Sequence, residues 1–251
     1  MMTNNSNHQH IMANNNPLLM KVRNDVTCFL NNYPQLIRNE RHLQVELARF
    51  LLGKACYGMV HTEYLVPVSE LVVRKPFNSK EEFPWKSVLN YIDIVVEIDG
   101  KFVLIELKYP TTEVQSSKLN PPFTLFGMPL QANTRVLANQ GAKPHVCYRY
   151  WKDVRRIEVV KQRFPNVVGG LAIMLTNDST FLKAPIKSAN YTSFSVHQGR
   201  TLQGQVTLDW LKPKSKMTGS HPKFIIDGSY SCDWHPVNYQ GVGFNYLILN
   251  V

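Results

Sequence analysis

Two neighbouring segments of the sequence place charged side chains where they could act together. Residues 91–98 and 101–109 are rich in β-branched and aromatic residues, and an Asp-Gly pair at 99–100 joins them. Such a pattern is the strongest short-range signal for a β-hairpin. If residues 99 and 100 form the turn, paired positions sum to 199, so Asp93 lies directly across from Glu106 on one face.

Two carboxylates in such a pair destabilise the strands, and a divalent cation bound between them removes that cost. Carboxylate oxygens suit Mg²⁺ or Mn²⁺, which can activate water and stabilise charge on a scissile phosphate. Lys108 follows Glu106 by two residues and shares its face of the strand. The spacing therefore places an ammonium at the rim of a predicted metal pocket formed by Asp93 and Glu106.

A second interpretation of the hairpin needs no metal. Asp93 and Glu106 could point to solvent from a half-exposed strand, with Lys108 as their counter-ion. A slip of one residue at the turn would move all three side chains to the other face together. The chemistry therefore depends on the register that the Asp-Gly turn implies.

The elements around the hairpin predict an α/β fold, a mixed sheet flanked by helices. Apolar residues recur at helical spacing over residues 17–30, 39–54 and 145–164. Strand patterns occupy residues 59–68, 71–73 and 167–176, and the glycines at 169–170 indicate a close approach of two backbones. Residues 77–84 are expected to form a polar loop and residues 111–130, which hold three prolines, a mobile loop.

The remaining segments divide the chain into three predicted parts. Residues 1–16 hold six asparagines and almost no apolar residues, which predicts a disordered tail. Residues 17–180 form the predicted core. Residues 181–251 form a basic, β-rich C-terminal extension, with short strands expected near 191–196, 205–211, 223–226 and 244–249.

Composition narrows the class of protein. Hydrophobic residues make up 44% of the 251, close to the globular norm, and the longest uncharged apolar run is far shorter than the ~20 residues of a membrane-spanning helix. Lys and Arg outnumber Asp and Glu by 28 to 18, and this net charge of +10 indicates a nucleic-acid partner or simply a basic enzyme. The four widely spaced cysteines form no zinc motif and fit reduced thiols in a cytoplasmic protein.

Two basic regions could contact phosphates. The polar side of the helix expected at 145–164 includes Arg149, Arg155 and Arg156, which could contact nucleic acid or could form an ordinary solvated face. Residues 181–223 carry seven Lys or Arg, one acid and several interleaved aromatic residues. These aromatic residues could stack on bases or could form the core of a small β subdomain.

The sequence resembles the PD-(D/E)xK nuclease superfamily, which includes restriction endonucleases and archaeal Holliday-junction resolvases. The resemblance rests on Ile92-Asp93, on Glu106-Leu107-Lys108 in the next strand, and on Glu46 in a preceding helix. It covers roughly residues 39–176, and Ile92 stands where the nominal motif has proline. It implies a restriction-endonuclease-like fold and Mg²⁺- or Mn²⁺-dependent hydrolysis of nucleic acid, with DNA as the expected substrate.

The resemblance also implies a role for each of these residues. Asp93 and Glu106 would bind the metal with the carbonyl of Leu107, and Lys108 would orient or deprotonate the attacking water. Glu46 would complete the metal shell, although it could equally be a helix glutamate paired with Arg49 or His42. Many relatives dimerise, so a homodimer is one option, and a non-catalytic nucleic-acid-binding or assembly module is the alternative function.

Overall fold

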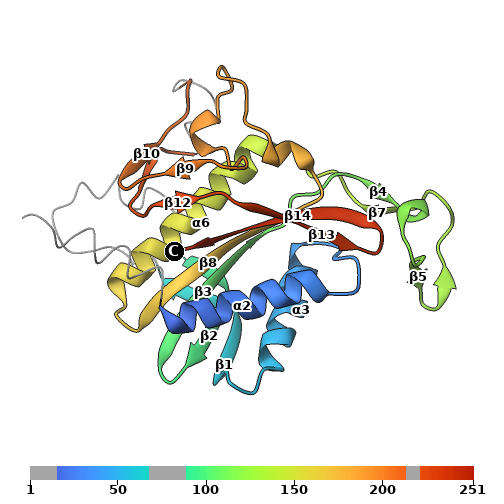
Figure 1. Ribbon diagram of the computed structural model, residues 1–251, viewed down its shortest axis with the longest axis horizontal. Coiled ribbons are helices and arrows are strands. Elements are labelled where there is room, and N and C mark those ends of the chain that lie inside the picture. The colour runs from blue at the N-terminus through green and yellow to red at the C-terminus, as the bar shows by residue number, and fades with distance from the viewer. Residues whose placement is uncertain (1–15, 68–88, 213–220) are drawn as a thin grey trace, which may run out of the picture.

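A six-stranded mixed sheet runs through the middle of the computed structural model, which describes residues 16–67, 89–212 and 221–251 (Figure 1). The strands lie in the order β1-β2-β3-β8-β14-β13. Neighbouring strands are antiparallel except β3 and β8, which are parallel. Their bounds are β1 (Met59–Pro67), β2 (Leu89–Ile98), β3 (Lys101–Lys108), β8 (Val167–Thr176), β13 (Trp234–Tyr239) and β14 (Val242–Asn250).

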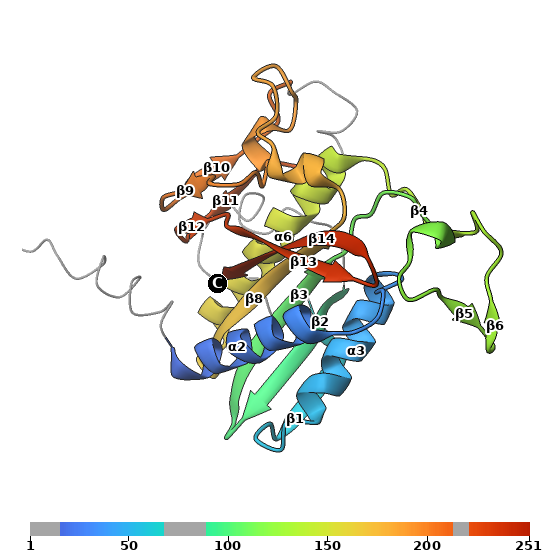
Figure 2. The same ribbon diagram turned by 45° about the vertical axis from the view of Figure 1, so that its right-hand side comes forward.

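Helices cover both faces of this sheet (Figure 2). Helices α2 (Pro17–Asn32) and α3 (Glu40–Leu52) pack on one face, and α6 (Lys143–Arg163) packs on the other. The side chains of β3 alternate accordingly, with Ile105 buried on the α2–α3 side and Leu104 on the α6 side. The predicted α/β sheet flanked by helices is therefore confirmed.

The turn between β2 and β3 has the register that the sequence predicted. Ile98 pairs with Lys101 and Ile94 with Ile105, so paired positions sum to 199. Asp99 and Gly100 have φ angles of +49° and +70°, as a two-residue hairpin turn of this type requires. Regular pairing with β3 extends from the turn as far as Ile94. Asp93, the preceding residue in the sequence, lies outside it, so its side chain is not fixed by strand pairing.

Helix α6 lies unusually close to the sheet because of a glycine in β8. A Cβ atom on Gly170 would come within 2.6 Å of the Ile157 side chain and 2.8 Å of the Leu104 carbonyl oxygen. The backbone approach predicted at residues 169–170 is confirmed. Because Gly170 lets α6 settle against β3, polar side chains of the helix reach the polar end of the hairpin.

Part of the C-terminal segment belongs to the central sheet, and the rest includes two small two-stranded sheets. Strands β14 and β13 complete the central sheet, so the boundary placed after residue 180 does not separate two structural layers. The strand expected at 191–196 is wrong, because a short 3₁₀ helix occupies that position. Small elements fill the rest: η2 (Ser179–Leu182), η3 (Thr192–Phe194), β9 (Thr201–Leu202), β10 (Val206–Leu208), β11 (Phe224–Ile226) and β12 (Tyr230–Ser231).

Residues 111–130, expected to form a mobile loop, belong to a projecting arm that has hydrogen-bonded structure (Figures 1 and 2). Two short ladders build it, the first between β4 (Val114–Gln115) and β7 (Arg135–Leu137). The second joins β5 (Thr124–Leu125) and β6 (Met128–Pro129), and η1 (Ser116–Lys118) lies between the two. Elements of two or three residues are too short to show a period in the sequence.

Three of the predicted segments lie mostly or wholly outside the described residues. The tail at 1–16, apart from Asn16, which caps α2, lies outside the described residues, as do the strand at 71–73 and the loop at 77–84. All four cysteines are free. Among the helices of the described segments, none has the length and apolar character needed to cross a membrane.

Candidate functional site

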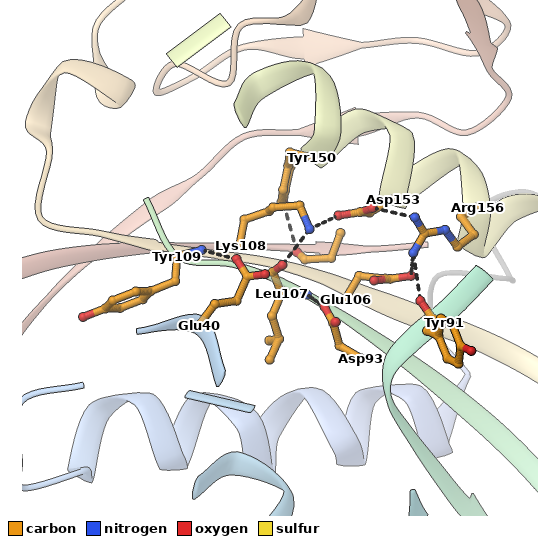
Figure 3. Close-up of polar contacts among 11 residues, drawn as sticks. Glu40, Tyr91, Asp93, Glu106, Leu107, Lys108, Tyr109, Tyr150, Asp153 and Arg156 are labelled. Atoms are coloured by element: carbon orange, nitrogen blue, oxygen red, sulfur yellow. Dashed lines mark hydrogen bonds and ion pairs between the residues drawn. The ribbon is translucent and has the colours of Figure 1, made fainter. Parts of the chain in front are cut away.

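The carboxylate of Asp93 binds the backbone of the neighbouring strand. The N–H of Leu107 donates a hydrogen bond of 2.6 Å to Asp93 Oδ2 (Figure 3). Because the ladder ends at Ile94, this side chain takes the place of a backbone acceptor and holds β2 against β3. The contact fixes one oxygen of Asp93 and leaves the carboxylate beside Glu106 and Lys108.

Lys108 lies inside the group rather than at its rim. Its side chain is only 17% exposed, and its Nζ lies 2.5 Å from Asp153 Oδ2 of α6. The same Nζ donates a hydrogen bond of 2.8 Å to the carbonyl of Leu107. The rim position expected from the sequence is therefore wrong, because α6 packs over this end of β3.

Glu106 is buried and paired. Its side chain is 2% exposed, and its Oε1 accepts a hydrogen bond of 2.6 Å from Arg156 of α6. Arg156 also donates to the carbonyl of Tyr91 at 3.0 Å and lies 3.3 Å from Asp153 Oδ1. Asp153 and Arg156 thus connect the hairpin to α6 in one polar network (Figure 3).

Burial controls the protonation of these groups. Burial raises the pKa of Asp93 and raises that of Glu106 well above its usual value, and the nearby Asp153 carboxylate adds to both shifts. Burial alone would lower the pKa of Lys108, but the surrounding carboxylates, Asp153 first, outweigh it and leave this pKa raised. Lys108 is therefore an ammonium at neutral pH, a source of positive charge and not a general base.

The charges of the network do not balance. When all three carboxylates, from Asp93, Glu106 and Asp153, are ionised, they face two cations, Lys108 and Arg156, which leaves a net charge of −1. Like charges confined in a poorly solvated space repel one another strongly. The network therefore favours an additional cation. Glu40 and Lys152 border the network. The pKa of Lys152 is lowered, first by burial and then by the charge of Arg156.

Helix α3 contributes two polar residues that the sequence interpretation missed. Glu40 Oε2 accepts a hydrogen bond of 3.0 Å from the N–H of Tyr109, directly after Lys108. Buried Gln44 donates one of 2.7 Å to the carbonyl of Asp93. At 100° per residue, both lie on the same side of the helix as Leu43 and Leu47, so the apolar stripe itself could have identified them.

Glu46 is not part of this group. It lies about 120° around α3 from Glu40 and faces a surface hollow lined by Phe29, Tyr33, Phe50 and neighbouring residues. Its nearest cation is Arg49 at 3.9 Å. The structure thus brings together Asp93, Glu106 and Lys108 but places Glu46 in the alternative arrangement, a helix glutamate beside Arg49.

The three candidate arginines of α6 have three different surroundings. Arg149 is exposed and Arg156 faces Glu106. Arg155 is buried, and it pairs with Glu158 at 3.0 Å and with Asp227. Arg155 therefore ties α6 to the C-terminal segment, and contact with nucleic acid at this position is contradicted by its burial.

The interleaved aromatic residues of the C-terminal segment also face inward. Phe194 and Trp210 are buried, with ring centroids 4.7 Å apart. Trp210 stacks on Tyr148 of α6 with centroids at 5.5 Å. The alternative interpretation, that the aromatic residues form a core, is confirmed for these two side chains, so neither is exposed to stack on a base.

The donor set of the hairpin fits a magnesium ion. The side chains of Asp93 and Glu106 are hydrogen-bonded to each other, so a metal ion bound between them would replace that contact. The Leu107 carbonyl has a second lone pair. Within residues 16–67, 89–212 and 221–251, no group of three or more His, Cys, Asp or Glu side chains is placed so that it could hold a metal ion. Mg²⁺ does not require such a cage, because it commonly binds through one or two carboxylates, water and substrate phosphate.

Comparison with known protein families, with curated proteins and with solved structures found no match to this chain.

Proposed function

We propose that this protein is a metal-dependent nuclease that hydrolyses phosphodiester bonds in nucleic acid, with DNA as its substrate. One observation carries the proposal: the hairpin and α6 gather Asp93, Glu106 and Lys108 into a poorly solvated network that has an excess of negative charge. Carboxylates with raised pKa values beside a fixed ammonium are typical of a functional site.

Asp93 and Glu106 would hold the metal ion, with the carbonyl of Leu107 as a third ligand. A bound Mg²⁺ ion supplies positive charge that favours ionisation of a water molecule and stabilises charge on the phosphate. Because it would also offset the charge of the two carboxylates, it would lower the pKa values that burial raises. Arg156 is then released from Glu106, and its guanidinium can contact a phosphate oxygen bidentately.

Lys108 would stabilise charge at the reacting phosphorus. A water oxygen forms a bond to phosphorus as the bond to the leaving oxygen breaks. One proton leaves the attacking water, and one joins the leaving oxygen. Negative charge grows on the non-bridging oxygens during this step, and the ammonium of Lys108 lies beside the carboxylates that would hold the metal. A positioned cation in a site with little water gives its largest benefit here.

A second candidate, a non-catalytic nucleic-acid-binding or assembly module, has one observation in its favour. Lys108 is paired with Asp153 at 2.5 Å and Arg156 with Glu106 at 2.6 Å. If these ion pairs persist in the presence of Mg²⁺, they neutralise the residues that a nuclease would use. The two candidates therefore differ in whether metal rearranges the network.

Cleavage of supercoiled plasmid tests the proposal. The wild-type protein should nick or linearise the plasmid with Mg²⁺ or Mn²⁺ and should stop when a chelator is added. Asp93→Asn should abolish cleavage. Asp99→Asn makes the same chemical change in the exposed turn of the same hairpin, where asparagine accepts a positive φ, so it should cleave normally.

Two results would contradict the nuclease proposal. The first is binding of DNA without cleavage under any of these metal conditions, which would favour the binding module. The second is equal cleavage by Asp93→Asn and wild type, which would place the activity elsewhere.

A further inference from the structure

The projecting arm, residues 116–134, carries an apolar tip. Figures 1 and 2 show β5 extending well beyond the sheet and its helices. At its end Phe126 is 97% exposed, Met128 70% and Leu125 49%. Large apolar side chains gathered at an exposed tip indicate contact with a partner.

Hydrogen bonds close the base of the arm, and further contacts attach it to the body. Ser116 Oγ donates a hydrogen bond of 2.7 Å to the Gln131 carbonyl, and the Ser116 N–H donates one of 2.8 Å to the Thr134 carbonyl. The N–H of Asn120 donates to the carbonyl of Gln240 in the β13–β14 turn at 2.8 Å. Leu119 is buried in the core on the α2–α3 side of the sheet. The base therefore holds the tip at a defined position.

The residue at the tip is a poor choice for the turn it occupies. Leu125 pairs with Met128, so Phe126 and Gly127 are the two turn residues, with φ angles of +51° and +81°. Asparagine and glycine suit such turns, whereas an aromatic residue there is strained. The ring of Phe126 is almost fully exposed, so packing within the chain does not offset that strain.

The arm belongs to the longest segment of the sequence that contains no acidic residue, and this segment follows the candidate site. Residues 114–152 contain five Lys or Arg and no Asp or Glu. The arm begins eight residues after Lys108, and the segment between is fixed by a 2.8 Å hydrogen bond from the Thr112 N–H to Asn177 Oδ1. This local excess of basic residues favours an anionic partner for the arm.

We propose that the arm is a second contact with the nucleic acid and that Phe126 and Met128 pack against unstacked bases. Apolar side chains on projecting elements insert between bases and favour kinked or unpaired positions, and aromatic rings stack on bases of any type. The choice of nucleic acid rests on the proposed function. The geometry further indicates a preference for substrates with bulged or unpaired nucleotides.

The test measures binding without cleavage. The dissociation constant of the full chain is measured by fluorescence anisotropy, in chelator, for a labelled DNA duplex with an unpaired bulge and for the fully paired duplex. Phe126→Asn removes the ring and introduces the Asn-Gly pair that this turn favours, so folding is preserved. Leu52→Asn is the matched control. Leu52 is also exposed, but it lies at the far end of α3, ~18 Å along the helix from Glu40.

Phe126→Asn should weaken binding to the bulged duplex by roughly 5- to 150-fold, the range expected for loss of one stacked base. Its melting temperature should equal or exceed that of the wild type. The slope of log K against log salt should stay unchanged because no charge is removed. Leu52→Asn should bind as the wild type does.

Equal affinity of Phe126→Asn and wild type for the bulged duplex would overturn the proposal. So would a Phe126→Asn defect that appears only in binding to anionic phospholipid vesicles, or only in self-association by analytical ultracentrifugation. If the wild type cleaves plasmid but the tip variant binds normally, only the arm proposal fails. If the wild type neither binds nor cleaves DNA, the proposed function fails as well.

Discussion

Replacement of Asp93 by asparagine should leave the metal-free protein as stable as the wild type or more stable. Asparagine keeps the oxygen that accepts the 2.6 Å hydrogen bond from Leu107 and removes one charge from a network with net charge −1. Relief of like-charge repulsion across a strand pair amounts to about 0.2–1 kcal/mol. In a chain of this size that corresponds to a rise in melting temperature of up to about 4 °C.

Thermal denaturation, followed by circular dichroism in chelator and again with increasing Mg²⁺, measures this effect. The wild type should gain stability with Mg²⁺ because a ligand that binds only the folded state stabilises it by mass action. Asp93→Asn should gain much less. The two curves should therefore cross, with the variant more stable without metal and less stable with saturating metal.

Asp25→Asn is the matched control because that carboxylate has the opposite electrostatics. Burial raises its pKa, but a hydrogen bond from Tyr57 and the ammonium groups of Lys21 and Lys54, at 3.3 and 3.4 Å, outweigh burial and lower it. Asp25→Asn should lose about 1–2 kcal/mol and keep the Mg²⁺ response. If Asp93→Asn instead loses stability as Asp25→Asn does, with an unchanged Mg²⁺ response, Asp93 is a structural partner and the reasoning is refuted.

Further predictions concern other members of the network and its surface. Lys108→Met should lower the melting temperature in chelator because it leaves Asp153 without its ammonium partner. Adding Asp153→Asn to this variant should restore part of the lost stability. A double variant that is less stable than Lys108→Met would contradict this pairing. Arg149→Ala should reduce the slope of log K for DNA binding against log salt by ~0.9 and leave the melting temperature unchanged. Arg155→Ala should mainly lower the melting temperature. The reverse pattern would contradict the exposure of Arg149 and the burial of Arg155. The folded state retains carboxyl protons that the unfolded state has already lost, so the network should destabilise the metal-free protein as pH rises above about 4. Stabilisation by Mg²⁺, measured by thermal denaturation, should therefore increase from pH 5 to pH 8, and a pH-independent increment would contradict the raised pKa values of Asp93 and Glu106.

The local part of the site was predictable because a two-residue turn fixes the register of a hairpin. The sum of 199 placed Asp93, Glu106 and Lys108 together, and the ladder between β2 and β3 has this register. The hydrogen bond from Gln44 to the Asp93 carbonyl could not be predicted, because the two residues are 49 positions apart in the sequence.

Helical periodicity could have shown that Glu40, and not Glu46, is the glutamate of α3 that lies beside the hairpin site. Glu40 lies on the side of α3 that carries Leu43, Leu47 and Leu51, which must face the sheet. Glu46 lies off that side. Cleavage assays can separate them: Glu40→Gln should reduce the rate more than Glu46→Gln, and the opposite order would favour the original interpretation.

One further feature has a local signal in the sequence. The sequence of β13 contains Pro236, which argues against a central strand, and β13 is indeed at the edge of the sheet.

Other features depended on contacts between distant segments. Burial of Arg155 follows from its pairing with Asp227, 72 residues later. The arm is built from strands of two or three residues whose pairing has no periodic signal.

The most direct test of the nuclease proposal is the single-turnover rate of cleavage of a labelled DNA duplex by wild type and by Glu106→Gln. Wild-type cleavage should require Mg²⁺ or Mn²⁺. Glu106→Gln, which retains the shape of the side chain but loses the charge that would bind the metal, should be slower by about 10²-fold or more. Metal-independent cleavage, or equal rates for the two proteins at every metal concentration, would contradict the assignment of this network as a metal-dependent hydrolytic site.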